Sequence, residues 1–375
     1  MLNRKYDLAA TIFLMKNKVH MSINKDEEFS GSLPDTQPPK DVVAFNELRS
    51  CADLYRLFKE EILDIQPEFQ RDVVWKLPEQ TVFIDSLIKQ LPIPSMCFSL
   101  DFNTQKWQVV DGLQRMTAIV KFLDDSEEWR LSRRTDINSK ISGRTNFDIR
   151  DGDPASAILY RKIQNLSLPI TVIRCDLTKV DHSEYLFTIF HRLNSGGSRL
   201  NHQEIRNCIY SGSFNNLLRE LDKSSNWKVI KNLLPAKGAR FRSIELILRF
   251  FALYAGQEKY TGNMPSFLNT FMRESRKIEP AQSKELSKLF NETVASLLKA
   301  IDNSKEKKVG YTLLEAALIG IAHNQVHVKK TNDVMLGIML DKLINSAEIT
   351  LAKNDTTATE VVRQRIAKSR KLFSD

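Results

Sequence analysis

The pentapeptide Asp111-Gly112-Leu113-Gln114-Arg115 carries the strongest chemical signal in this sequence. A carboxylate, an amide and a guanidinium lie within five positions, around a glycine that can adopt a left-handed turn. A guanidinium can bind phosphate oxygens with two donors at once, and a carboxylate suits a hard cation such as Mg²⁺. The pentapeptide therefore predicts a phosphate or metal-phosphate site, while an ordinary helix cap beside an exposed arginine explains the same residues.

The segments on either side of the pentapeptide predict a strand and a helix. Gln108-Val109-Val110 is short and β-branched, as in a buried strand. After the turn, apolar residues recur at the i, i+3, i+4 and i+7 spacing of one helix face: Met116, Ile119, Val120 and Leu123. A helix that begins directly after a strand points its first backbone amides at one place, which favours an anion there.

Length and composition limit the classes of protein to consider. The 375 residues are enough for about two domains. The net charge of +9 favours polyanionic partners without identifying one. The four cysteines are widely spaced, which is typical of reduced thiols in a cytosolic protein. No apolar run reaches the roughly 18 residues that span a bilayer, so we expect a cytoplasmic protein without membrane partners.

The order of the predicted elements indicates an α+β chain in three parts. Residues 1–40 are expected to be a disordered segment and linker, residues 41–200 an α/β domain, and residues 201–375 a helical domain. In the α/β part we predict a helix over Phe45–Lys59, a helix from Pro78 that ends at Leu91-Pro92, a hairpin of Ser95–Leu100 with Lys106–Val110, and a strand over Leu168–Cys175. The charged stretch 124–156 is expected to be a partly mobile surface insertion.

Later segments are predicted to be mainly helical. Ser183 is expected to cap one helix, and Asn201 with Glu204 forms a variant capping box for the next. The helices expected further on are Ile244–Tyr254, Leu286–Ile301, Tyr311–Val328, Val334–Ile344 and Thr357–Phe373. The last carries the basic residues Arg363, Arg365, Lys368, Arg370 and Lys371, which we interpret as a solvated face, with nucleic-acid backbone binding as the alternative.

Several motifs together resemble the N-terminal domain of GmrSD-type modification-dependent restriction systems. Asp111–Arg115 is similar to the family's D-G-Q-Q-R, and Gln70–Trp75 to its Q-R-x-x-x-W. Leu91–Pro94 matches its P-I-P step, and Arg192–Asn207 resembles its N-x-G…L-x-x-x-E-x-R-N block. The resemblance covers roughly residues 45 to 215, and the order and spacing of its motifs are more specific than any one of them.

The resemblance implies a fold related to the ParB and sulfiredoxin group and a nucleotide-binding site, in an Mg²⁺-dependent NTPase that acts as sensor or regulator in antiphage defence. It implies catalytic roles for Asp111, Gln114 and Arg115, with Asp111 as the Mg²⁺ ligand. The implied nucleotide-binding residues are Gln70, Arg71, Gly112, Arg115, Thr117, Asn194, Ser195, Gly196 and Gly197. Glu204 and Arg206 would organise the site. Leu113 stands where the family usually has its first Gln.

Two other classes of function stay open. One is a ParB-like DNA-binding protein or nuclease that does not depend on nucleotide, and the other is a non-catalytic scaffold whose site has decayed. The partners considered are a nucleoside triphosphate, DNA, a separate nuclease subunit and a second copy in a homo-oligomer. Asp181-His182 lacks the following Asn and His of an HNH nuclease, and the pair His323 and His327 lacks a zincin glutamate, so neither predicts a nuclease or zinc site.

Overall fold

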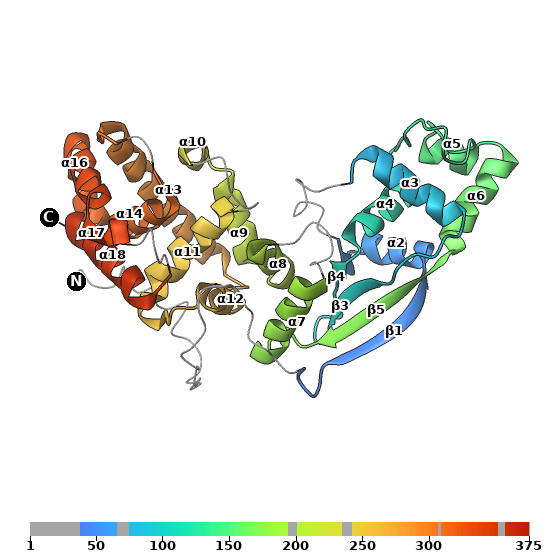
Figure 1. Cartoon of the computed structure of the whole chain (residues 1–375), viewed down its shortest axis with the longest axis horizontal. Coiled ribbons are helices and arrows are strands. Elements are labelled where there is room, and N and C mark those ends of the chain that lie inside the picture. The colour runs from blue at the N-terminus through green and yellow to red at the C-terminus, as the bar shows by residue number, and fades with distance from the viewer. Residues whose placement is uncertain are drawn as a thin grey trace. The chain divides into compact units, whose positions relative to one another are not determined.

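The computed structural model describes residues 38–65, 75–193, 201–234, 242–306, 309–351 and 357–374. The chain divides into two compact units between Leu200 and Asn201. We call them the α/β unit and the helical unit, and each is described by itself (Figure 1). The first contains a five-stranded sheet and the second is built from helices, so the predicted α+β class is confirmed.

The sheet of the α/β unit brings the predicted hairpin into its interior. Its strands are β1 (Val43–Ser50), β2 (Leu63–Asp64), β3 (Met96–Asp101), β4 (Trp107–Asp111) and β5 (Ser167–Cys175). Their order is β1-β5-β3-β4-β2. β3 and β4 pair antiparallel as predicted, β3 is parallel to β5, and β1 runs antiparallel to β5 along the edge. β2 extends the other edge in parallel with β4.

Helices cover the sheet and bury its apolar side chains. They are α2 (Cys51–Lys59), α3 (Leu77–Ile88), α4 (Leu113–Leu123), α5 (Asn146–Asp151), α6 (Pro154–Asn165) and α7 (Val180–Leu193). α2, α3, α4 and α6 pack against one another, while α7 lies against β4. The predicted stripe of α4 is confirmed, because Met116 and Ile119 are completely buried in the same core as Phe98 of β3.

Three predictions in the α/β unit are wrong. Residues 45–50 belong to β1 instead of a helix, because this segment pairs with β5 over its whole length and α2 begins only after Ser50. The stretch 124–156 is packed, since Leu131 and Ile141 lie buried in the core. Ser183 does not cap α7, which begins at Val180; its hydroxyl donates to the Lys179 carbonyl inside the first turn.

The helices of the helical unit surround a core rich in aromatic rings. Its helices are α8 (His202–Ile209), α9 (Ser213–Asp222), α10 (Ser225–Leu233), α11 (Arg242–Gly256), the 3₁₀ helix η3 (Gln257–Lys259), α12 (Met264–Glu274), α13 (Pro280–Asn303), α14 (Tyr311–His323), α15 (Gln325–Val328), α16 (Asp333–Ile344), α17 (Ala347–Leu351) and α18 (Thr359–Leu372). Phe214, Phe251 and Phe290 are buried at the centre and meet neighbouring rings edge to face. The helices predicted beyond residue 240 are all present, although a break at Asn324 separates α14 from α15. Within the described ranges, no helix is long and apolar enough to cross a bilayer.

Candidate functional site

A left-handed glycine joins β4 to α4. Gly112 has φ 94° and ψ 15° and is the N-cap of α4. A β-carbon added to it would lie 2.5 Å from the Cγ of Met96 on β3, far inside van der Waals contact. The position therefore requires glycine for two reasons, the positive φ and the close approach of the neighbouring strand. This tight turn leaves only Gly112 between the end of β4 and the start of α4.

The N-terminus of α4 has no side-chain cap from its N-cap residue, because glycine has no side chain. The first intrahelical hydrogen bond runs from the Met116 amide to the Gly112 carbonyl at 2.9 Å. The amides of Leu113, Gln114 and Arg115 come before it, so they point out of the first turn in the direction that favours an anion.

Contacts within the α/β unit hold the Arg115 side chain in place without a ligand. Its guanidinium donates to the Pro94 carbonyl, and Nη2 lies 2.9 Å from Asp111 Oδ2 and 3.5 Å from the Ser95 carbonyl. The side chain is 14% exposed, whereas that of Asp111 is 40% exposed. Burial lowers the pKa of the Arg115 guanidinium, and the nearby Asp111 carboxylate counteracts part of this. Arg115 thus fastens the segment before β3 to the turn and keeps a fixed orientation.

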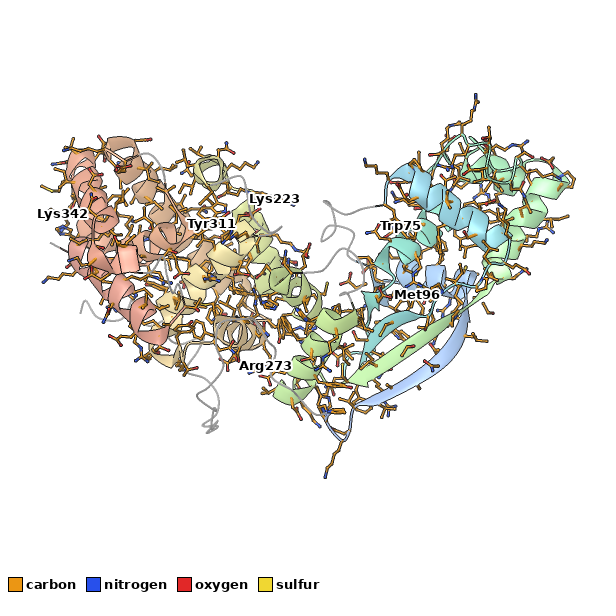
Figure 2. The ribbon with its side chains drawn as sticks, in the orientation of Figure 1. Trp75, Met96, Lys223, Arg273, Tyr311 and Lys342 are labelled. Atoms are coloured by element: carbon orange, nitrogen blue, oxygen red, sulfur yellow. The ribbon has the colours of Figure 1, made fainter. Side chains whose placement is uncertain are left out.

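Gln114 connects the same turn to the residues that precede α3. Its Oε1 accepts a hydrogen bond from the Trp75 backbone amide at 2.9 Å. The Gln80 side chain donates to the Trp75 carbonyl at 3.0 Å, so the Trp75 backbone is held on both sides. The Trp75 ring packs on Phe83 with a centroid distance of 5.5 Å. Figure 2 labels Trp75, which lies just before α3, and Met96, the first residue of β3.

Leu113 and Thr117 both have structural partners. Leu113, the departure from the family motif, packs against the hydrophobic core of the α/β unit. The Thr117 hydroxyl donates to the Leu113 carbonyl at 2.8 Å, within the helix. Its donor is therefore used locally, although its oxygen can still accept.

The structure gathers Asp111, Gly112, Gln114, Arg115 and Thr117 at one turn of the α/β unit. Six other residues predicted to bind nucleotide lie outside the described residues: Gln70, Arg71, Asn194, Ser195, Gly196 and Gly197. Arg115 also has partners that no local pattern in the sequence predicted, the carbonyls of Pro94 and Ser95.

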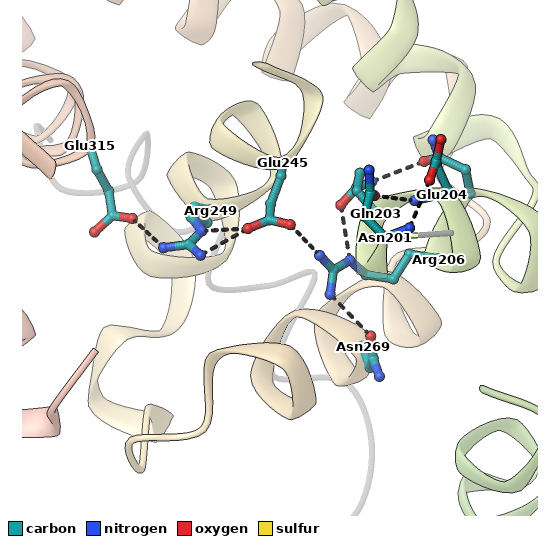
Figure 3. A network of polar contacts seen from close by, with 9 residues as sticks. Asn201, Gln203, Glu204, Arg206, Glu245, Arg249, Asn269 and Glu315 are labelled. Atoms are coloured by element: carbon teal, nitrogen blue, oxygen red, sulfur yellow. Dashed lines mark hydrogen bonds and ion pairs between the residues drawn. The ribbon is translucent and has the colours of Figure 1, made fainter. Parts of the chain in front are cut away.

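Glu204 and Arg206, predicted to organise the site, belong to the helical unit. Asn201 and Glu204 form the predicted capping box of α8: the Glu204 amide donates to Asn201 Oδ1 at 3.0 Å, and the Asn201 amide donates to Glu204 Oε2 at 2.7 Å. Arg206 is 1% exposed and lies 2.7 Å from Glu245 of α11, with Gln203 and Asn269 as further acceptors. Figure 3 shows this network.

The network continues as a chain of alternating charges, in which Glu245 and Arg249 are partly exposed and Glu315 and Arg365 are buried. Glu245 also pairs with Arg249 at 2.8 Å, Arg249 with Glu315 of α14 at 3.4 Å, and Glu315 with Arg365 of α18. Burial alone would raise the pKa of Glu245, but Arg206 and Arg249 outweigh it and hold the pKa below its usual value. Arg365 is 1% exposed, so the expectation of a solvated basic face on the last helix is wrong for this residue. The network ties α8, α11, α14 and α18 into one structure.

The described side chains offer little to a metal ion unless a phosphate is bound with it. Across the described ranges, no cluster of three or more His, Cys, Asp or Glu side chains has the geometry to hold one. Mg²⁺ in phosphate-transfer sites uses one or two carboxylates and takes its other oxygens from phosphate and water. Asp111 fits that arrangement only together with a bound phosphate.

His182 of α7 has a structural role. It is 2% exposed, and its Nε2 lies 2.8 Å from the Asp41 carboxylate.

The fold and the turn define a mixed α/β domain whose β4–glycine–α4 connection has the form of an anion site. Residues 54–211 match the family model described as the GmrSD restriction endonuclease, N-terminal domain, so this segment is similar to that domain. The matched segment runs from α2 to the residues just after α8. Neither the curated proteins nor the solved structures gave a match.

Proposed function

We propose that the chain binds a nucleoside triphosphate at the β4–α4 turn, as the sensor or regulator of a restriction-type defence system. The match of residues 54–211 to the N-terminal domain of the GmrSD restriction endonuclease supports the restriction context. The observation that carries the proposal of binding is that two features occur together at the start of α4. The N-cap residue of α4 is a glycine, which supplies no side-chain cap, and a partly buried guanidinium is fixed beside it.

The geometry supports phosphate as the bound group. The amides at the start of α4 and the positive end of the helix dipole favour an anion. Pro94 and Asp111 fix the orientation of the Arg115 guanidinium, so little conformational entropy is lost when a phosphate is bound. In the described part of the chain nothing accepts from its Nε, which leaves a donor for a ligand oxygen.

Hydrolysis is the further step of the proposal. Asp111 would hold Mg²⁺ through the carboxylate oxygen that does not face Arg115, and the ion would neutralise charge on the phosphates. Gln114 would act by holding the turn against Trp75, and Asp111 would orient the ion or a water. Because Leu113 packs against the core, we propose that it supports the turn without contacting nucleotide.

Titration with ATP, GTP and CTP, with and without Mg²⁺, tests the proposal by calorimetry and thermal shift. A ligand at 100 times its Kd stabilises the folded state by about 2.7 kcal/mol. We expect such a shift in wild type and in the control Arg130→Ala, and a loss of at least about tenfold in affinity in Arg115→Lys, which cannot form the fork. Asp111→Asn should retain binding but lose its Mg²⁺ dependence. Equal affinities in wild type and folded Arg115→Lys would contradict the proposal.

A second candidate, DNA binding by the helical unit, has its own observation. Residues 201–375 contain 28 Lys and Arg against 18 Asp and Glu, a net charge of +10, whereas residues 1–200 contain 27 against 28, a net charge of −1. The whole positive excess of the chain therefore lies in its helical part. Arg363, Arg370 and Lys371 of α18 are exposed and belong to this excess.

Binding of duplex DNA by fluorescence anisotropy over a salt series tests this candidate. Each neutralised phosphate adds about 0.9 to the slope of log K against log salt. We expect Arg363→Ala/Arg370→Ala/Lys371→Ala to reduce that slope. An unchanged slope would remove α18 from the binding surface. The Arg115→Lys variant should bind DNA like wild type, which separates this function from nucleotide binding.

A further inference from the structure

β1 is an edge strand without the usual protection against pairing. Among the described strands its only neighbour is β5, and it lies at the margin of the sheet (Figure 1). Edge strands are commonly shortened, bulged, or protected by lysine or proline. β1 is eight residues long, contains no lysine or proline, and pairs with β5 without a register shift.

Exposed apolar side chains accompany this free edge. Leu48 is 72% exposed, and Val43 and Phe45 are 40% and 38% exposed. Leu48 stands opposite Pro169 and Phe45 opposite Val172, so the exposed side chains lie on both faces of β1. A flat edge with apolar side chains on both faces favours pairing with another strand.

The hydrogen bonds around Pro169 show which groups of β1 point away from the sheet. Pro169 has no amide hydrogen, and its carbonyl accepts from the Ser95 hydroxyl on the β3 side of β5. Pro169 therefore directs its backbone groups away from β1, and its partner Leu48 is a non-hydrogen-bonded position in the β1–β5 ladder. The amide and carbonyl of Leu48 then point outward, as do those of Ala44 and Asn46, two and four residues before it.

We propose that β1 pairs antiparallel with β1 of a second copy of this chain, about a twofold axis at Leu48. In this register Leu48 exchanges both backbone hydrogen bonds with Leu48 of the second copy. Glu47 then stands opposite Arg49 of the second copy, twice, so the charges are complementary. A register centred on Asn46 would instead place Glu47 opposite Phe45, so that the carboxylate would lose its basic partner across the two strands. The two sheets join into one continuous sheet.

The expected dimer is reversible, because a short strand ladder buries less than the roughly 1,200 Å² of a stable interface. We expect a dissociation constant on the order of 10 µM, measured by sedimentation velocity on the full chain. Leu48→Pro removes the outward amide without touching a β1–β5 hydrogen bond, and it should raise the dissociation constant at least tenfold. Leu48→Lys should do the same through charge repulsion at the axis. The control Leu91→Lys changes another half-exposed leucine of the α/β unit and should dimerise like wild type.

Hydrogen exchange measured above and below the dissociation constant locates the contact. The amides of Asn46 and Leu48 should be protected only at the higher concentration, while that of Ala44, beyond the paired residues, stays exchangeable and those of β5 stay protected at both. Circular dichroism establishes that the Leu48 variants are folded. A wild type that is monomeric at about 100 µM would overturn the proposal. So would a dimer that persists unchanged in folded Leu48→Pro.

Discussion

Arg115 Nη2 lies 2.9 Å from Asp111 Oδ2, and the same guanidinium also holds the backbone carbonyl of Pro94. The two charged residues that bracket the candidate site thus bind each other across one turn. A residue that looks like a phosphate ligand in the sequence also connects β4, α4 and the segment before β3. Loss of Arg115 should therefore affect stability and ligand binding together.

Arg115→Met is expected to lower the free energy of unfolding by about 2–3 kcal/mol, because two backbone carbonyls and a carboxylate lose a charged donor. Asp111→Asn should lower it by less than about 1 kcal/mol, since Asp111 is 40% exposed and solvent screens its ion pair. Urea denaturation followed by circular dichroism measures both. Equal losses in the two variants would mean that the bond to Pro94 contributes little.

Gly112→Ala should destabilise the α/β unit by about 2–4 kcal/mol. The alanine would have to keep a positive φ, which costs about 1 kcal/mol, and its β-carbon would collide with Met96 on a packed strand. Gly143→Ala is the matched control: its φ is +70°, but its nearest neighbour is the flexible Arg133 side chain at 3.3 Å. Thermal melts should show a clearly larger loss for Gly112→Ala, and similar losses would argue against the Met96 contact.

Glu245→Gln should cost about 3 kcal/mol, because it leaves the buried guanidinium of Arg206 and the partly buried one of Arg249 without their shared carboxylate. Asp136→Asn removes a carboxylate paired with Arg134 at the surface, where solvent screens the ion pair, so the loss should be much smaller. Chemical denaturation of the two variants gives the comparison. A loss in Glu245→Gln as small as that in Asp136→Asn would show that the chain of charges is not a stabilising element.

His323 should make the helical unit sensitive to mild acid. Burial, with a smaller contribution from Arg370, lowers the pKa of His323 from 6.5 to about 4. The unfolded chain therefore binds a proton at pH values where the folded chain does not, and stability falls as the pH drops from 6.5 towards 4. From pH 7 to pH 5 the expected loss is about 2 kcal/mol.

The variant His323→Phe isolates that effect, since a phenyl ring can retain the contact with the Tyr254 ring, whose centroid lies 4.6 Å away. Denaturation at several pH values should show a smaller loss between pH 7 and pH 5 in this variant than in wild type. The same slope in both proteins would indicate that His323 titrates normally in the folded state.

Local patterns predicted the elements whose stabilising contacts lie close in the sequence. The stripe of α4, the hairpin of β3 and β4 and the capping box of α8 depend on spacings of two to four residues or on one short turn. The prediction for residues 45–50 was wrong because the pairing partner of β1 lies more than 100 residues away in β5. The packing of Leu131 and Ile141 was not predicted for a different reason: charged residues dominate that stretch of sequence.

The sequence by itself determined that a glycine turn joins a strand to a helix at Asp111–Arg115, because the residue types and their periodicity allow little else there. The order of its motifs also predicted the family model that residues 54–211 match. Only the tertiary structure decided that Arg115 turns towards Pro94, that Arg206 is buried beside Glu245, and that Leu48 faces outward at a sheet edge. Those outcomes depend on which distant segments meet, and side-chain direction and burial are set by that packing.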